Sequence, residues 1–121
     1  ITHIDKTFVG LFHANIKGSK VVAQTLNDGF SVDIFESLDF ACLGHIHTRQ
    51  TFDYKGIKIA YAGSTIQKDF GENITGHGYL IWDVENKNFE TVDIETEYGL
   101  YIFEIDSTED ILFDKEKLIN Y

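Results

Sequence analysis

The interpretation of this chain starts from one stretch, Asp39-Phe40-Ala41-Cys42-Leu43-Gly44-His45-Ile46-His47. An apolar run that ends at a glycine is typical of a buried β-strand. Because alternate side chains of a strand share a face, His45 and His47 can point the same way where the chain leaves the sheet. Neutral imidazole is a common metal ligand, so the pair predicts half of a metal site. The alternative is two polar residues at a strand edge.

A third histidine stands in the same context. The apolar run Thr7-Phe8-Val9-Gly10-Leu11-Phe12 predicts another covered strand, and His13 follows it directly. If the two strands are neighbours, the three imidazoles converge at one edge of the sheet. A histidine in such a place can equally satisfy a structural hydrogen bond, so spacing alone leaves both interpretations open.

The remaining patterns predict mainly β structure. The range 20–26 fits either a short strand or a short helix, and residues 27–29 form a turn. Ser31 is expected to cap a short helix over residues 32–38. Alternating runs predict two hairpins, followed by a strand and a last helix. The expected ranges are 51–54 with 57–61, 79–84 with 89–94, 100–105 for the strand and 107–118 for the helix.

Composition limits the class of protein. A chain of 121 residues is one domain or part of one, and 43% hydrophobic residues suit a folded core. The sequence has no apolar run near the roughly 18 residues that span a bilayer, so we expect no membrane contact. The single cysteine, Cys42, is expected to pack as a small hydrophobe, which suits a reducing, cytoplasmic location. Because methionine is missing, we expect the chain to be the later part of a longer protein.

The net charge of −10 is unevenly distributed. Residues 1–82 carry 8 acidic and 7 basic side chains, whereas residues 83–121 carry 12 acidic and 3 basic ones. An acidic segment opposes contact with nucleic acid, which needs cations to neutralise phosphates. Any contact with DNA must therefore use metal ions or the near-neutral part. The acidic tract is either solvated surface or a contact for a basic partner.

These motifs, taken in order, resemble the calcineurin-like metallophosphoesterases. The resemblance begins with Val9-Gly10-Leu11-Phe12-His13 and the stretch quoted first. The later runs are similar to those of SbcD-type DNA exonuclease subunits, and the whole covers roughly residues 7–95. The later runs are Tyr61-Ala62-Gly63-Ser64-Thr65-Ile66-Gln67, Phe70-Gly71-Glu72 and Gly76-His77-Gly78-Tyr79.

The resemblance implies a hydrolase that uses two divalent metal ions, usually manganese, to cut phosphodiester bonds. By motif position, His13 and His45 would bind one ion and His47 the other. Asn15 and Ser64 lie where the family approaches the substrate phosphate, although both could simply satisfy loop backbone groups. The chain has no Asp-x-His, Gly-Asp-x-x-Asp or Gly-Asn-His motif, which in the family supply the bridging aspartate and the acid–base groups. No catalytic residue is therefore assigned, and the chain alone is expected to be inactive.

The resemblance also implies the fold and the partners. We expect an α+β chain, mainly β with short helices, that forms the C-terminal half of a four-layered αββα sandwich. Residues 1–97 would be the later part of the nuclease domain, and residues 98–121 a strand and a helix leading into a capping region. The implied partners are DNA, an SbcC-like SMC ATPase subunit and the N-terminal half of the same domain. A half-sandwich exposes apolar sheet surface, so a homodimer is a further possibility.

Two other functions remain open from the sequence. The parent protein could be a different metallophosphoesterase that acts on nucleotides with the same three histidines. Alternatively, the β-rich body and the acidic tract could form a non-catalytic assembly module that docks onto an SMC-like ATPase.

Overall fold

The computed structural model describes residues 6–22, 24–102 and 104. Eight strands and one short 3₁₀ helix form within them. In chain order they are β1 (Val9–His13), β2 (Lys20–Val21), β3 (Gln24–Thr25), η1 (Val32–Phe35), β4 (Phe40–Gly44), β5 (Gln50–Tyr54), β6 (Ile57–Tyr61), β7 (Gly78–Asp83) and β8 (Asn88–Asp93). The prediction of a mainly β chain with short helices is confirmed.

The central sheet has the strand order β1-β4-β6-β5. Strands β1 and β4 run parallel, as do β4 and β6, whereas β5 pairs antiparallel with β6. The two apolar runs that precede histidines in the sequence are thus neighbouring parallel strands. Their C-terminal ends lie at the same edge of the sheet, because His13 is paired in register with Gly44.

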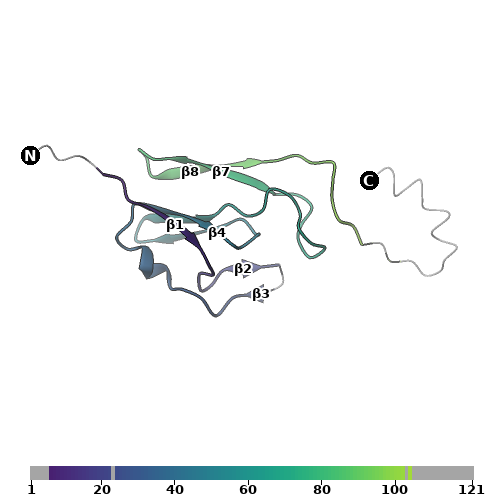
Figure 1. Cartoon of the computed structure of the whole chain (residues 1–121), viewed down its shortest axis with the longest axis horizontal. Coiled ribbons are helices and arrows are strands. Elements are labelled where there is room, and N and C mark those ends of the chain that lie inside the picture. The colour runs from purple at the N-terminus through teal and green to yellow at the C-terminus, as the bar shows by residue number, and fades with distance from the viewer. Residues whose placement is uncertain (1–5, 23, 103, 105–121) are drawn as a thin grey trace, which may run out of the picture.

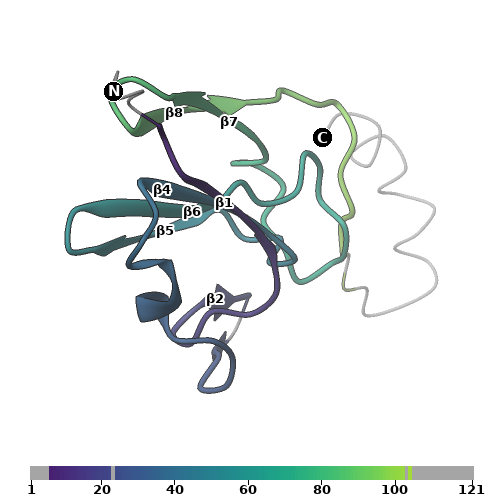
Figure 2. The same ribbon diagram turned by 60° about the vertical axis from the view of Figure 1, so that its left-hand side comes forward.

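The central sheet separates two smaller layers (Figures 1 and 2). The β7–β8 hairpin covers one face, where Trp82 stacks on Phe40 at 4.6 Å between ring centres. The β2–β3 hairpin and η1 lie on the opposite face. Alternation along each strand makes this possible, since Phe40 faces the β7–β8 hairpin while Ala41 faces the other layer.

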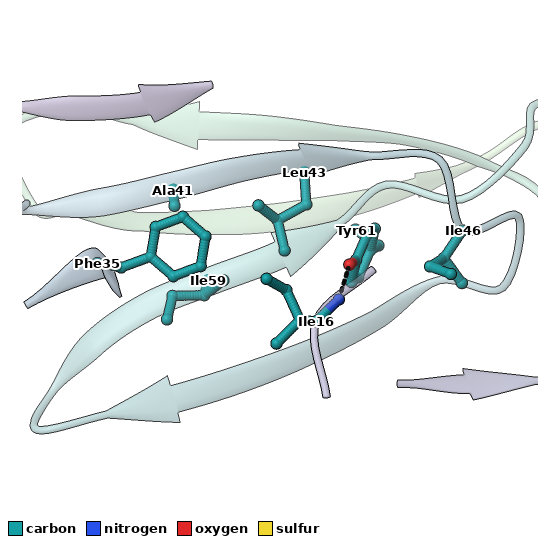
Figure 3. Packing of buried hydrophobic residues seen from close by; sticks show 7 residues of the cluster. All are labelled: Ile16, Phe35, Ala41, Leu43, Ile46, Ile59 and Tyr61. Atoms are coloured by element: carbon teal, nitrogen blue, oxygen red, sulfur yellow. Dashed lines mark hydrogen bonds between the residues drawn. The ribbon is translucent and has the colours of Figure 1, made fainter. Parts of the chain in front are cut away.

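The hydrophobic core fills the space between the sheet and the β2–β3 side (Figure 3). Ile16 and Tyr61 are completely buried in it. The Tyr61 hydroxyl accepts a hydrogen bond from the Ile16 N–H at 2.9 Å and donates one to the Ala14 carbonyl at 2.7 Å. The core therefore fixes the segment that directly follows His13. The other core residues are Phe35, Ala41, Leu43, Ile46 and Ile59.

The outer edge of the sheet exposes apolar side chains. Strand β1 stands last in the strand order, with one neighbour among the described strands. Leu11 is 81% exposed, and Val9 beside it on the same face is 42% exposed. The sequence expectation of uncovered apolar sheet surface is met at this strand.

Both predicted hairpins form, and the open range 20–26 resolves as the β2–β3 hairpin. Three separate sheets form in the described residues, because each of the β2–β3 and β7–β8 hairpins pairs only with itself. Residues 32–38 do not make an α-helix; η1 ends at Phe35. Ser31 occupies the N-cap position, but its side chain makes no capping hydrogen bond, so that prediction is wrong.

The C-terminal expectations fare differently. Leu100, Tyr101, Ile102 and Glu104 lie outside any strand, which contradicts the strand predicted over 100–105. No described strand pairs with this segment, and the backbone of Leu100 instead bonds the Gln67 side chain, which accepts the Leu100 N–H at 2.6 Å and donates to the Leu100 carbonyl at 3.2 Å. The predicted helix over 107–118 lies outside the described residues. Nothing in the described part of the chain is a helix long and apolar enough to cross a bilayer.

Candidate functional site

The two strand-end histidines meet at the sheet edge. His13 is the last residue of β1, and His45 follows the last residue of β4. Their ring centres lie 5.2 Å apart, with the ring planes at 66°. Metal-bound imidazole nitrogens lie roughly 2.1 Å from their ion, so two rings at this separation can share one ion. The predicted convergence of these two histidines is confirmed.

The backbone at Gly44 and His45 allows this approach. A Cβ at position 44 would lie 2.9 Å from His13 Nδ1, so any other residue there would force the ring to shift. His45 itself has φ +94°, a left-handed conformation that costs a non-glycine residue roughly 1–3 kcal/mol. The chain thus turns sharply off the strand at His45 and aims this residue toward His13.

The same turn corrects the prediction that His45 and His47 share a strand face. Strand β4 ends at Gly44, so the period of two does not extend to the two histidines. His45 contacts His13, whereas His47 Nδ1 lies 2.8 Å from Glu72 Oε1. The two rings therefore have different neighbours.

A cleft of about 390 Å³ nevertheless brings the three histidines together. His13, His45 and His47 all line it, and each is exposed. Lys68 adds a cation to the same cleft, which favours an anionic ligand. The remaining lining residues are Gly44, Ile46, Gly63, Ser64 and Thr65.

The donor set in this cleft fits a metal only in part. In the described residues, no group of three or more His, Cys, Asp or Glu side chains is close enough to hold an ion. The His13–His45 pair supplies two nitrogen donors, but manganese and magnesium prefer carboxylate oxygens. Among the described residues, no carboxylate joins the His13–His45 pair in a group that could hold an ion.

The two residues expected near a substrate phosphate lie in different environments. Asn15 lines an adjoining pocket of about 310 Å³ with His45 and His47, and its buried Oδ1 has no hydrogen-bond partner among the described residues. Ser64 also lines the histidine cleft, but its hydroxyl lies 2.9 Å from His77 Nδ1. The contact with His77 supports a structural role for Ser64. The Asn15 Oδ1, by contrast, is free to accept a hydrogen bond from a ligand as far as the described residues show.

His77 is a structural loop residue. It is 7% exposed, and its Nε2 lies 2.6 Å from the Asn73 carbonyl while Nδ1 faces Ser64. Gly63, at φ +80°, lets the segment after β6 pass close to the loop after β4, since a Cβ there would lie 2.8 Å from the His47 carbonyl.

Cys42 takes no part in the cleft. Desolvation by burial raises the pKa of its thiol, so the sulfur stays protonated and unreactive at neutral pH. The expectation that it packs as a small hydrophobe agrees with this environment.

Two further residues support the site without any role having been assigned to them from the sequence. Glu72 contacts His47, and its place in the Phe70-Gly71-Glu72 run was the only indication in the sequence. Arg49 follows the histidine pair and donates from Nη1 to Asp93 at 2.6 Å and from Nε to the Ala62 carbonyl at 3.4 Å. Arg49 thereby ties the loop after β4 to β8 and to the end of β6.

Comparison with known proteins relates the chain to a component of a nuclease. It is 30% identical to the SbcD subunit of the nuclease SbcCD from Staphylococcus epidermidis over 125 aligned positions, which cover 96% of this chain and 33% of that protein. The chain resembles a nuclease subunit. An uncharacterized protein, R555, of Acanthamoeba polyphaga mimivirus is 31% identical over 97 residues, covering 78% of this chain and 7% of that protein.

The similarity is distant and covers a minor part of each relative. No protein-family model matches the chain. Because the chain spans about a third of the SbcD-type relative, the comparison supports a relationship to nucleases at a coarse level.

Proposed function

We propose that this chain is the C-terminal part of a divalent-metal-dependent phosphodiesterase that cleaves DNA, active only together with an N-terminal part. One observation carries the proposal. His13 and His45 end neighbouring parallel strands with their rings 5.2 Å apart, in a chain that is similar over 96% of its length to a nuclease subunit. A sheet edge where parallel strands end is a common place for a catalytic site.

The cofactors in this proposal are two divalent ions, with manganese the first choice. His13 and His45 would hold one ion and His47 the other. Bound in this way, the ions would supply a nucleophilic hydroxide at neutral pH and neutralise the charge that develops on the phosphate. Two further residues beside the histidines would contact the substrate or an ion. Lys68 adds positive charge for the phosphate, and Asn15 offers an acceptor near His45 and His47.

The proposed N-terminal part would complete both the site and the sheet. The described residues that line the cleft include none of the carboxylates that manganese prefers, so the N-terminal part would supply these ligands. Strand β1 offers an open edge with Val9 and Leu11 exposed on one face, beside the histidine cleft. Further strands placed there would cover apolar surface and bring new side chains to His13. A second copy of the chain is the alternative occupant.

The proposed partners are DNA and an SbcC-like SMC ATPase subunit. The residues around the cleft belong to the near-neutral part of the chain, so they do not repel a nucleic acid as the acidic tract does. That tract, residues 83–121, includes all of β8 but only the last residue of β7, and it would face the ATPase subunit or solvent.

The test uses the longer protein that the proposal implies, with the 121-residue chain as the comparison. We expect manganese-dependent cleavage of linear duplex DNA by the longer protein and none by the chain alone. His45→Ala should lower the cleavage rate by at least about 100-fold, because the ion loses a ligand that no neighbour replaces. Thr51→Ala, an exposed β5 position outside the cleft, is the control.

Three results would contradict the proposal. Robust DNA cleavage by the chain alone would refute the need for an N-terminal part. Hydrolysis of nucleotides with no cleavage of DNA would favour the alternative that the parent protein is a metallophosphoesterase acting on nucleotides. The longer protein could lack nuclease activity and still bind an SMC-like ATPase after all three cleft histidines are replaced. That result would favour the assembly module.

A further inference from the structure

Glu72 is a buried carboxylate with a partner on each oxygen. Its side chain is 6% exposed, whereas the His47 side chain beside it is 51% exposed. Oε1 lies 2.8 Å from His47 Nδ1, and Oε2 accepts a hydrogen bond from the Lys68 N–H at 2.8 Å. The carboxylate thus joins the loop that carries it to the histidine loop after β4.

The position of Glu72 is set by its own loop. The Gln67 amide donates to the Glu72 carbonyl at 3.0 Å, and Gln67 is itself 8% exposed. Asp69 Oδ1 accepts the Gly71 N–H at 2.8 Å, and the Asp69 carbonyl accepts the Glu72 N–H at 3.3 Å. Because these bonds do not involve His47, the carboxylate is the fixed partner and the half-exposed imidazole is the group that it orients.

The geometry points to Glu72 as a positioning residue that holds His47 with its proton on Nδ1 and presents Nε2 as the nitrogen available to a divalent cation in the cleft. An ionised carboxylate can only accept hydrogen bonds, so the imidazole nitrogen facing it must carry hydrogen. In the neutral ring the lone pair then lies on Nε2. Carboxylates often orient metal-binding histidines in this way, and the role of the cation rests on the function proposed above.

Glutamine at position 72 gives a sharp test because it has nearly the same shape. The carboxylate accepts from two donors, whereas a side-chain amide has one oxygen and one NH₂ group. The Lys68 N–H can only donate, so it takes the amide oxygen and leaves the NH₂ group toward His47. His47 can form a hydrogen bond with this NH₂ group only if Nδ1 accepts it and the ring proton lies on Nε2. Glu72→Gln should therefore reverse the tautomer with little change in shape.

The first measurement is the tautomer of His47 by ¹⁵N NMR of the imidazole rings in the 121-residue chain, without metal, in mildly alkaline buffer where imidazole is neutral. The wild-type chain should show hydrogen on Nδ1, and Glu72→Gln should show hydrogen on Nε2. Glu90→Gln, which removes an exposed carboxylate on β8, should leave the His47 signals unchanged. Hydrogen on Nε2 in the wild-type chain would overturn the proposal, whether or not any variant folds.

The second measurement is Zn²⁺ binding, followed by the ring signals of the same proteins. Glu72→Gln should weaken binding at His47 by about 10- to 100-fold, and Glu90→Gln should not. Equal affinity in both variants, with the tautomer reversed, would overturn the role of Nε2 as a ligand. Neither measurement uses DNA cleavage, so a parent protein without nuclease activity would refute the proposed function and leave the tautomer result standing.

Discussion

At the scale of single residues, Tyr61 links the core to the candidate site. Its hydroxyl bridges the Ile16 N–H and the Ala14 carbonyl, both in the segment that leaves β1 after His13. Ile16 is completely buried, so its N–H has no access to water as a substitute partner. The hydroxyl therefore holds the backbone next to a proposed metal ligand.

Tyr61→Phe tests this link. Removal of the hydroxyl leaves the buried Ile16 N–H unpaired, which should lower the free energy of unfolding by about 1–3 kcal/mol. Urea denaturation of the wild-type chain and the variant measures the difference. Tyr54→Phe, in the neighbouring strand, is the matched control. In the described residues, the bridge between Ile16 and Ala14 is made by Tyr61 and not by Tyr54. Equal losses for both variants would contradict the role given to Tyr61.

The sequence predicted some site residues for a physical reason and missed others. His13 and His45 could be predicted to meet because parallel strands end at one sheet edge. The different surroundings of His47 could not, since they depend on the φ of His45 and on Glu72, which is 25 positions away. The local sequence pattern indicates the periodicity of a strand. It does not show where the strand ends in a turn, or which carboxylate from a distant part of the chain lies beside that turn.

At the scale of the elements, aspartates stabilise the places where strands begin or turn. Asp39 precedes β4 and accepts from Lys87 in the β7–β8 turn and from the Phe8 N–H before β1. Asp53 accepts from Lys58 and from Gly56 within the β5–β6 hairpin. Asp83 accepts from Asn86 in the β7–β8 turn. These hydrogen bonds lower the pKa of each carboxyl.

The lowered pKa of Asp39 predicts a loss of stability in acid. The hydrogen bond from Lys87, and then that from Phe8, favour the charged form in the folded chain. The stabilisation is fully present above the ordinary aspartate pKa near 4 and is lost as the pH falls through the lower folded value. We expect Asp39→Asn to reduce the pH dependence of the melting temperature below about pH 4.

Asp28→Asn is the control for the acid experiment, because Asp28 is exposed and has no described hydrogen-bond partner among residues 6–22, 24–102 and 104. It should follow the wild-type melting curve across the same pH range. If the melting temperature of Asp39→Asn depends on pH as steeply as that of the wild-type chain, the hydrogen bonds of Asp39 do not contribute to the loss of stability in acid.

Hairpins were the elements best predicted from the sequence, and for a local reason. Alternating side chains and a short turn lie within about a dozen residues, so β5–β6 and β7–β8 could be recognised directly. The helix predicted over 32–38 is shorter than expected, because only the 3₁₀ helix η1 forms and it ends at Phe35. The strand predicted over 100–105 failed because a strand needs a neighbouring strand, which its own sequence pattern does not specify, and no described strand pairs with it.

At the scale of the whole molecule, the open side of β1 is where we expect another chain to associate. Leu11 is 81% exposed on a strand whose outer hydrogen-bonding edge has no described partner. Such an edge readily pairs with another chain. The net charge of −10 opposes the approach of two copies, and salt screens this repulsion. Association of the chain should therefore increase with both protein concentration and salt.

Sedimentation velocity across a range of protein and salt concentrations measures this association. Leu11→Lys places a charge on the open strand and should shift the distribution toward monomer. Thr51→Lys adds the same charge to β5 at the opposite edge of the sheet and is the matched control. A chain that stays monomeric under all conditions, or equal effects of the two variants, would contradict the assignment to β1.

The parallel pairing of β1 with β4 also bears on the order in which the chain folds. Phe8 and Asp39, which begin this pairing, are 31 positions apart, whereas each hairpin closes over a few residues. Hairpins form within microseconds, but a distant pairing must first meet the entropy of closing a long loop. We therefore expect the pairing that brings His13 and His45 together to form after the hairpins. A ligand held between them would report that the chain has reached its native topology.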